Sequence, residues 1–499
     1  MGASLEIFVG RSEEVALLDS LLDEARAGAG RLVILTGEPG IGKSRLAEEV
    51  TRRAQAAGCL TAWGRSWEGP GTPAYWPWVQ LLRRIGDAYS DELLAPAAAT
   101  EDAEHARFLL FDRVARALHA VAAQRPLLLV LDDIHAADAA SLMLLQFVAR
   151  GLRGSRVLLI AAARDASFVA PSQTYPLLAQ VAREARHIAL ERLARSDLSD
   201  WVARAAAVVE VDRLYAVTEG NPLYVEELLA AAKKRPDVRL GAGQLPLGIR
   251  EAMRAHLALV SEPALRLLEI ASVVGRELPR SLLEAVAAPH ELEALDEALA
   301  SDILRDVGEG RLRFSHMLVR DELYARLGED RRGALHQRAA SASQDRAAAA
   351  HHALLGARAE DAASALARVH AAMRETSGRL AHEDAARLGQ RALETLERHL
   401  APAEICALLV AIGEARVLAG DLAGGQVIGE RAAAMAAELG LPELLARGAL
   451  TRAAEVAFGG DDTAAEWLRR ALEALPDGDS PVRVQLMARL AVAIHVPAA

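Results

Sequence analysis

The feature that most constrains the fold of this chain is a glycine-rich loop at residues 37–44, which has the sequence GEPGIGKS. The loop fits the pattern G-x-x-x-x-G-K-[ST]. It lies between an apolar run typical of a strand, Arg31 to Thr36, and a helical stretch, Arg45 to Ala56. In such a loop the backbone N–H groups face phosphate oxygens, and the positive end of the following helix points at them. The loop therefore predicts binding of ATP or GTP.

The two residues that close the loop have distinct expected roles. We expect Lys43 to bring a mobile positive charge to the terminal phosphates and Ser44 to place its hydroxyl on Mg²⁺. The other residues around them that we expect to contact the nucleotide are Gly37, Pro39, Gly40, Ile41, Gly42 and Arg45.

Two further apolar runs end in charged residues. The run Leu127 to Leu131 is followed by Asp132 and Asp133, and the run Val157 to Ala162 leads to Arg164. Ligands of open α/β sheets bind at the carboxyl ends of the strands. We therefore expect Asp132 to complete the Mg²⁺ shell, Asp133 to polarise the attacking water and Arg164 to sense the terminal phosphate. Taken alone, an Asp-Asp pair more often begins a turn, and a strand-end arginine can simply be solvated, but the upstream phosphate loop favours the functional interpretation of the acids.

The order of patterns along the chain predicts several domains. The first 165 residues, with a further strand at Leu60 to Gly64, alternate strands and helices as a parallel sheet covered by helices does. Residues 166–237 have helical patterns. Residues 245–335 predict a small helix-rich domain with a two-stranded wing, because Gly308 and Gly310 lie between the apolar segments of Leu304 to Phe314 as in a hairpin.

Residues 336–499 are mostly alanine-rich amphipathic helix, and the pattern recurs. The triplets at residues 391–393, 431–433 and 470–472 (RAL, RAA and RAL) are 40 and 39 residues apart. Gly-Asp pairs fall at matching turns, at residues 420–421 and 460–461. A period near 40 is typical of stacked helical hairpins, slightly longer than a tetratricopeptide unit. The alternative is a chance recurrence in alanine-rich sequence.

Composition excludes several classes of protein. The net charge is −11 and no dense Lys/Arg stripe is present, which argues against direct DNA binding by this chain. The two cysteines, Cys59 and Cys406, lack the spacing of a disulfide framework or zinc site, so we expect a cytoplasmic protein. The longest apolar runs are far shorter than the ~18 residues that cross a bilayer, so no membrane partner is expected.

Aromatic residues are only 4% of the chain, yet five of them cluster in residues 63–78. Such a cluster can stack on a ligand or anchor a partner protein. Because prolines surround it, we favour a rigid insertion packed over the sheet. The five residues are Trp63, Trp67, Tyr75, Trp76 and Trp78.

Several motifs together resemble a known family. They are FVGR at residues 8–11, the phosphate loop, LDDIHAAD at 131–138, the strand ending at Arg164, TEGNPLYVEE at 218–227 and RFSHMLVR at 313–320. In this order they resemble the signal transduction ATPases with numerous domains, the STAND class of the AAA+ lineage. With a helical repeat domain at the end, the chain is similar to the N-terminal portion of large ATP-binding LuxR-type transcription regulators of bacteria.

The resemblance implies a P-loop nucleotide-binding domain at residues 1–166, a helical lid at 167–240, a winged-helix domain at 241–335 and TPR-like helical repeats at 336–499. It implies that Val9 and Arg11 line the adenine and ribose and that Pro222 packs on the base. By the same resemblance, His316 touches the β-phosphate in the resting state. The alternative for His316 is a satisfied histidine between domains.

The resemblance implies a switch that binds ATP or ADP with Mg²⁺. ADP would hold the domains closed; an inducer or partner protein sensed by the repeats, with exchange for ATP, would open them and allow self-association. Enzymes of this lineage that turn over rapidly usually have glutamate where Asp133 stands, so we expect slow hydrolysis. Because no helix-turn-helix pattern is present, the DNA-reading surface is expected in a segment or partner outside this chain. The alternative is a scaffold that keeps ATP bound for stability, does not hydrolyse it, and docks partner proteins through its repeats.

Overall fold

The structure, a computed structural model, describes residues 8–66, 73–86, 103–165, 175–205, 209–234, 257, 260–301, 303–308, 310–315, 317–454 and 461–494. The chain divides into two compact units. Residues 1–69, 75–92 and 111–328 form the first unit, and residues 70–74, 93–110 and 329–499 form the second. In the part of the chain that is described, every helix is too short or too polar to span a membrane.

A five-stranded parallel sheet lies at the centre of the first unit, with the strand order β2-β3-β4-β1-β5. Its strands are β1 (Arg31–Thr36), β2 (Leu60–Arg65), β3 (Leu127–Asp132), β4 (Val157–Ala162) and β5 (Ala185–Ala189). The sequence predicts both ends of β1 and β4, and it places the ends of β2 and β3 one residue too early. The predicted parallel α/β core is therefore confirmed.

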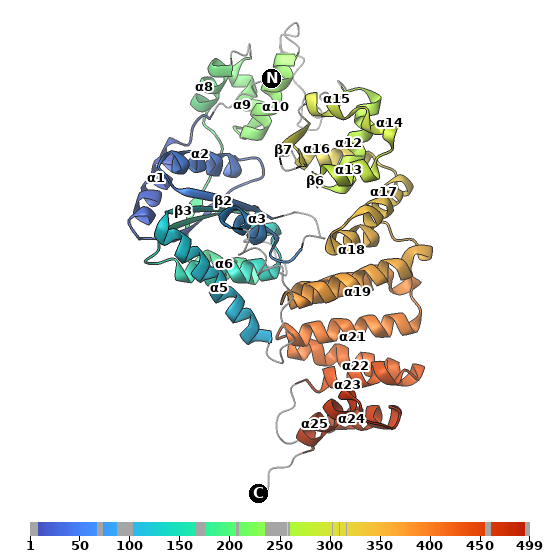
Figure 1. Cartoon of the computed structure of the whole chain (residues 1–499). Coiled ribbons are helices and arrows are strands. Elements are labelled where there is room, and N and C mark those ends of the chain that lie inside the picture. Colours follow the sequence, from blue (N-terminus) through green and yellow to red (C-terminus); the bar gives the residue numbers. More distant parts are fainter. Residues whose placement is uncertain are drawn as a thin grey trace. The chain divides into compact units, whose positions relative to one another are not determined.

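Helices cover both faces of this sheet. In Figure 1, α2 (Lys43–Ala56) lies above the sheet, whereas α5 (Ala103–Gln124) and α6 (Ala139–Gly151) lie below it. Side chains of α1 (Ser12–Arg26) and α2 pack against alternate residues of the strands, such as Val33 and Leu35 of β1. Because helices lie on both sides, all six residues of β3 and of β4 are buried, which explains their uninterrupted apolar runs.

Strand β5 lies within residues 166–237, where the sequence indicates helices. It pairs with β1 as an edge strand of the core sheet, so this sheet includes residues beyond 166. Only Ile188 of its five residues is buried. A half-exposed edge strand needs no continuous apolar run, so the segment gives no clear strand pattern.

The rest of this segment is helical. Helices α7 (Tyr175–Arg183), α8 (Arg195–Ala205), α9 (Val211–Thr218) and α10 (Pro222–Lys234) flank or follow β5. The last three share a small apolar core, which includes Trp201, Leu214 and Val225. The predicted boundary at residue 240 lies outside the described residues.

A second, antiparallel sheet belongs to the same unit, with the strand order β6-β8-β7. The predicted hairpin is confirmed: β7 (Leu304–Gly308) and β8 (Arg311–Phe314) pair, and Gly308 and Gly310 have the positive φ angles of 84° and 67° that a tight turn requires. A third strand, β6 (Glu277–Pro279), was not predicted. The helices of this region are α12 (Glu262–Val274), α13 (Arg280–Val286), α14 (Pro289–Leu292), α15 (Leu295–Ala300) and α16 (Met317–Arg326).

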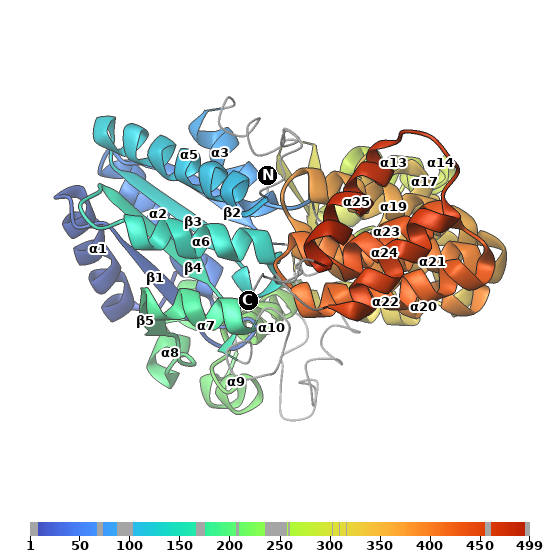
Figure 2. The same cartoon turned by 90° about the horizontal axis from the view of Figure 1, so that it is seen from below.

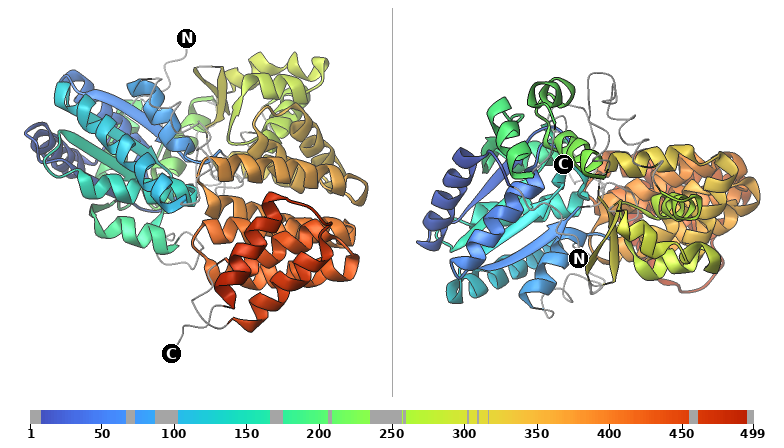
Figure 3. Two further views of the ribbon diagram at one scale, coloured as in Figure 1. Left: turned by 60° about the horizontal axis from the view of Figure 1, so that its bottom comes forward. Right: turned by 90° about the horizontal axis from the view of Figure 1, so that it is seen from above.

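The second unit is built mainly from helices packed side by side (Figures 2 and 3). They are α17 (Glu329–Ala342), α18 (Arg346–Leu355), α19 (Ala362–Gly378), α20 (His382–Leu396), α21 (Pro402–Leu418), α22 (Leu422–Leu439), α23 (Pro442–Arg452), α24 (Asp462–Ala474) and α25 (Pro481–Ala493). The expected start of the repeats at residue 336 falls inside α17, whereas the two units divide between Gly328 and Glu329.

The recurring triplets fall on every second helix of this unit. Their central alanines, Ala392, Ala432 and Ala471, lie on α20, α22 and α24 and are fully buried. Asp421 and Asp461 each cap the helix that follows, because their carboxylates accept from the N–H groups of residues 424 and 464. The period of the sequence therefore corresponds to one pair of helices. The assignment of these pairs to the TPR type stays a prediction.

The aromatic cluster is partly described. Tyr75 and Trp78 are fully buried, and the indole N–H of Trp78 donates to the carbonyl of Ser141 on α6 at 3.0 Å. The indole N–H of Trp63 donates to Thr51 Oγ1 on α2 at 3.1 Å. These contacts favour packing within the core over ligand stacking for the three residues. Trp67 lies outside the described residues.

Candidate nucleotide-binding site

The phosphate loop joins β1 to α2, and its lysine is turned back onto the loop. Gly42 has φ 100° and stands immediately before the helix, a conformation that favours glycine. Lys43 is the first residue of α2 and is only 8% exposed. Its ammonium group donates to the carbonyls of Gly37 at 2.8 Å and Glu38 at 3.0 Å. These bonds hold the charge of Lys43 at the mouth of the loop.

Burial is the main cause of a lowered pKa for Lys43. The negative charges of Asp133 and Asp132 oppose this shift, whereas the charge of Arg164, at the end of β4, adds to it. These electrostatic interactions place all three strand-end residues near Lys43. Negatively charged phosphates there would favour the protonated lysine.

The predicted Mg²⁺ ligands lie together. Asp132 ends β3 and is 1% exposed, and the Ser44 hydroxyl lies 2.8 and 3.0 Å from its two carboxylate oxygens. A hydroxyl and a carboxylate are hard oxygen donors of the kind that Mg²⁺ prefers, usually with phosphate oxygens and waters completing its shell. No cluster of three or more His, Cys, Asp or Glu side chains suited to a metal occurs among the described residues.

An arginine that the sequence analysis did not assign also contacts Asp132. Arg65 ends β2, and its guanidinium donates to Asp132 Oδ2 from Nη2 at 2.8 Å and from Nε at 3.1 Å. The two residues are direct partners in the register of β2 and β3. The strand-end rule that pointed to Asp132 would also have found Arg65 had it been applied to β2. Arg65 partly neutralises the carboxylate that is expected to hold the metal.

The carboxylate of Asp133 has a different partner from that of Asp132. It has φ 56° and ψ 41°, in the left-handed region, and begins the short 3₁₀ turn η1 (Ile134–Ala136). Its carboxylate forms an ion pair with Arg276 Nη1 at 3.0 Å. Arg276 immediately precedes β6 of the second sheet. Burial and the charge of Asp132 raise the pKa of Asp133, while Arg276 opposes the shift.

The structure places the residues expected around the base as follows. Val9 is buried in the small core shared with α8 to α10. Arg11 is occupied by protein groups: it pairs with Glu14 and donates to the carbonyls of Ile41, at 3.1 Å, and Glu191. This segment therefore ties the loop to the helices after β5.

Pro222 and His316 are two further residues expected to contact the nucleotide. Pro222 is the first residue of α10 and is half-buried. Its neighbours Asn221 and Leu223 hydrogen-bond to the phosphate loop. His316 lies outside the described residues.

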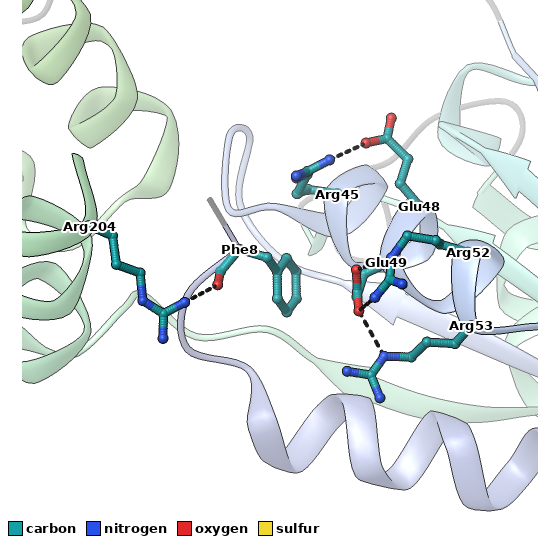
Figure 4. A pocket seen from close by; sticks show the side chains of 7 residues that line it. All are labelled: Phe8, Arg45, Glu48, Glu49, Arg52, Arg53 and Arg204. Carbon is teal, nitrogen blue, oxygen red and sulfur yellow. Dashed lines mark hydrogen bonds and ion pairs between the residues drawn. The ribbon is translucent and has the colours of Figure 1, made fainter. Parts of the chain in front are cut away.

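A cleft of about 550 Å³ opens beside the first turns of α2. Figure 4 shows the side chains that line it, with the ring of Phe8 between Arg204 of α8 and the charged face of α2. Arg45, the last of the predicted loop contacts, is exposed there and pairs with Glu48. The remaining lining residues are Glu49, Arg52 and Arg53. The cleft is therefore charged and open, with one aromatic side chain.

Residues 7–160 match the family model of the AAA ATPase domain. The chain therefore carries an AAA ATPase domain, which supports nucleotide binding and typically implies Mg²⁺. The matched segment includes the phosphate loop, Arg65, Asp132 and Asp133, and it ends within β4.

Comparison with known proteins gives one curated relative and several solved structures. An uncharacterised protein of Rhizobium meliloti (strain 1021), R02095, is 26% identical over 399 residues, which are 68% of this chain and 38% of that protein. The chain thus spans about two fifths of the length of this relative. A STAND protein with a tetratricopeptide repeat sensor from Pyrococcus horikoshii has a TM-score of 0.47 at 13% identity, over 98% of this chain and 74% of its own. The ORC2 protein of Aeropyrum pernix has a TM-score of 0.33 at 17% identity, over 63% and 93%.

Several residues that contact the AAA domain's site come from outside the strand ends. Besides Arg276, they include Arg192 and Asn221, which bind Glu38 of the phosphate loop. Asn221 lies in the TEGNPLYVEE motif at residues 218–227, but the motif alone does not indicate its contact with the loop. Arg192 and Arg276 lie in no recognisable pattern, because only the folded chain brings them to the loop and to Asp133.

Proposed function

We propose that this chain is the ATP-dependent switch of a signal-transduction protein in transcription control. It binds ATP or ADP with Mg²⁺ at the phosphate loop, through Lys43, Ser44 and Asp132. Slow hydrolysis, with Asp133 orienting water and Arg164 stabilising charge, resets the switch. Nucleotide state governs opening of the domains and self-association, and the helical unit takes up an inducer or a partner protein.

The ion pair between Asp133 and Arg276 is the observation that carries this proposal. Asp133 must face a water molecule to assist hydrolysis, and Arg276 holds its carboxylate at 3.0 Å from outside the core sheet. Hydrolysis therefore requires this pair to loosen. A displacement of the second sheet would therefore change the activity of the site through this contact.

Further charges extend the same link. Glu277, the first residue of β6, accepts from Arg311 of β8 at 2.7 Å and lies 3.8 Å from Arg65. Arg65 in turn binds Asp132. Asp133 is thus linked to the second sheet through Arg276. Asp132 is linked to it through Arg65 and Glu277. When bound, Mg²⁺ would neutralise charge on the phosphate oxygens, and Ser44 and Asp132 would hold it.

One observation favours the alternative function, a scaffold that binds ATP without hydrolysing it. Asp132 and Asp133 are both engaged by arginines, so neither carboxylate is free for chemistry in this arrangement. A scaffold would keep these pairs permanently. A switch would release them in part of its cycle.

Phosphate release by the full chain with Mg²⁺ and ATP separates the two functions. For the switch, we expect slow release by the wild type, a loss of about 100-fold or more in Asp133→Asn, and faster release in Arg276→Gln because the carboxylate is freed. The control is Arg280→Gln, which removes a nearby arginine that pairs with the exposed Glu284. A chain that releases no phosphate in any variant would contradict the switch and support the scaffold.

The pH dependence gives an independent readout of the same pair. Because Arg276 opposes the rise in the pKa of Asp133, its removal should raise that pKa further, so that turnover of Arg276→Gln declines at a higher pH than turnover of the wild type. The role in transcription control predicts that cells carrying Arg276→Gln and Asp133→Asn differ in their transcript profiles. Identical profiles would contradict that role.

A further inference from the structure

Glu38, the second residue of the phosphate loop, has contacts that phosphate binding does not explain. The loop pattern accepts any residue at this position. The Glu38 carboxylate is held by the segment after β5: Arg192 donates to it from Nε at 2.8 Å and from Nη2 at 2.9 Å, in a bidentate ion pair. Asn221 Nδ2, just before α10, donates to the same carboxylate at 2.8 Å. Two segments that follow the core sheet therefore meet on one loop side chain.

Every polar atom of the Asn221 side chain has a hydrogen-bond partner. It is 2% exposed. Its Nδ2 also donates to the carbonyl of Pro39 at 3.1 Å, and its Oδ1 accepts from the N–H of Leu223 at 3.1 Å. A buried amide with every partner supplied is held in one orientation, because any rotation would leave polar atoms unpaired.

The backbone makes the same connection. The N–H of Leu223 donates to the carbonyl of Gly40 at 3.2 Å, and a Cβ added to Gly40 would lie 2.6 Å from Leu223 Cβ. The turn before α10 is itself fixed, since Gly220 and Leu193 are so close that a Cβ on Gly220 would lie 2.2 Å from the Leu193 carbonyl oxygen. Three consecutive loop residues, 38 to 40, are thus bound to the start of α10 or to the segment before it.

These contacts have a consequence for a bound nucleotide. The free N–H groups of the loop are expected to face the phosphates. The bonds from Asn221 and Leu223 go to the carbonyls of Pro39 and Gly40, whereas Glu38 is held through its side-chain carboxylate. These bonds restrain residues 38 to 40 while α10 stays attached, so we expect them to slow loosening of the loop around a bound phosphate group. Arg192 also offsets the negative charge of Glu38, which would otherwise repel phosphate.

We propose that Glu38 is a positioning residue that latches α10 and Arg192 to the phosphate loop and sets the rate at which a bound nucleoside diphosphate is released. The inference rests on the nucleotide binding of the proposed function. It adds the residue that controls exchange. Breaking the latch is the step that frees the site for ATP.

The test measures release of mant-ADP from the full chain by stopped-flow displacement with excess unlabelled ADP. In Glu38→Ala the release rate should rise about tenfold or more, because hydrogen bonds to a charged group are lost. The association rate should stay within a factor of two of the wild-type rate. The melting temperature without nucleotide should stay within a few degrees of the wild-type value. A residue needed only for stability would change the melting temperature instead.

Glu38→Gln and Glu219→Gln are a matched pair of controls. Both remove one negative charge from beside Arg192, but the side chain of Glu219 is 72% exposed. We expect faster release in Glu38→Gln and unchanged release in Glu219→Gln. Release from Glu38→Ala at the wild-type rate, with binding retained, would overturn the latch alone. A wild-type chain that binds no mant-ADP would overturn the nucleotide proposal and the latch with it.

Discussion

Asp132 and Asp133 are neighbours in sequence, but their backbone conformations send their carboxylates to different partners. Asp132 is extended at the end of β3 and lies against Ser44, whereas Asp133 adopts the left-handed region and reaches Arg276. That region costs a non-glycine residue about 1 kcal/mol or more, so surrounding contacts must hold it. The N–H of Asp133 donates to Asp132 Oδ1 at 3.1 Å and supplies one such contact. Two adjacent acids can thus serve two roles, one toward metal and one toward water.

The helical unit contains a histidine whose burial predicts a pH-dependent stability. His382 begins α20, is buried, and has no hydrogen-bond partner for either ring nitrogen in the described part of the chain. Burial, and to a lesser extent the charge of Arg107, lower its pKa to about 4. Between pH 6.5 and about 4 the unfolded chain takes up a proton that the folded chain does not. Stability is therefore full above pH 6.5 and is lost as the pH falls through this window.

The expected loss between pH 7 and pH 5 is about 2 kcal/mol in the free energy of unfolding. Urea unfolding at the two pH values should show this loss in the wild type but not in His382→Asn. His399→Asn, which changes an exposed histidine, should behave as the wild type does. An equal loss in His382→Asn and the wild type would show that another group causes the pH dependence.

How much of the site could be predicted depends on how local its signals are. The Ser44–Asp132 pair follows from two local patterns, a phosphate loop and a strand end, that the topology of a parallel sheet brings together. The contact of Arg276 with Asp133 joins residues 143 apart and depends on where the second sheet lies. No sequence pattern near either residue indicates that the two lie close together in space. Arg65 is intermediate, because its position at the end of β2 was visible but its register with β3 was not.

At the scale of elements, burial decides which strands the sequence reveals. β3 and β4 are buried on both faces and appear as continuous apolar runs. β5 and β6 are an edge strand and a three-residue strand with one buried residue each, so neither gives a pattern. Helices of the second unit were predicted as a group because alanine and a period of 40 mark them together.

Two glycines within helices of this unit predict opposite effects of the same substitution. A Cβ on Gly448 of α23 would lie 2.8 Å from the backbone nitrogen of Ala433 on α22, and backbone atoms there cannot move aside alone. A Cβ on Gly333 of α17 would meet no atom within 4 Å. Gly448→Ala should therefore lower the free energy of unfolding by about 1–3 kcal/mol. Gly333→Ala should raise it by up to about 1 kcal/mol, since alanine favours the helix.

Urea unfolding followed by circular dichroism measures both effects. Because the two variants add the same methyl group to a helix, helix propensity alone would stabilise both. Stabilisation in Gly448→Ala would therefore contradict the close approach of α22 and α23.

At the scale of the whole molecule, the apolar cores described in the two units differ in composition. In the first unit, the core beneath α1 and α2 is largely leucine, valine and isoleucine from strands and helices. Two cores described in the second unit contain many alanines, which let helices approach closely. The low aromatic content of the chain therefore reflects chiefly the helical unit. Because the chain divides into two compact units, we expect the units to unfold in separate steps.

Ligand binding can assign these steps. A nucleotide that binds only the folded first unit stabilises that unit by mass action, by about 2.7 kcal/mol at a ligand concentration 100 times its dissociation constant. Calorimetry of the full chain should show two transitions, and Mg²⁺-ADP should raise the temperature of one of them. Lys43→Ala should abolish this shift, whereas Gly448→Ala should lower the temperature of the other transition and leave the shift intact. If Mg²⁺-ADP raises the temperatures of both transitions equally, the units unfold cooperatively. The nucleotide bound at the site then affects the stability of the helical unit as well.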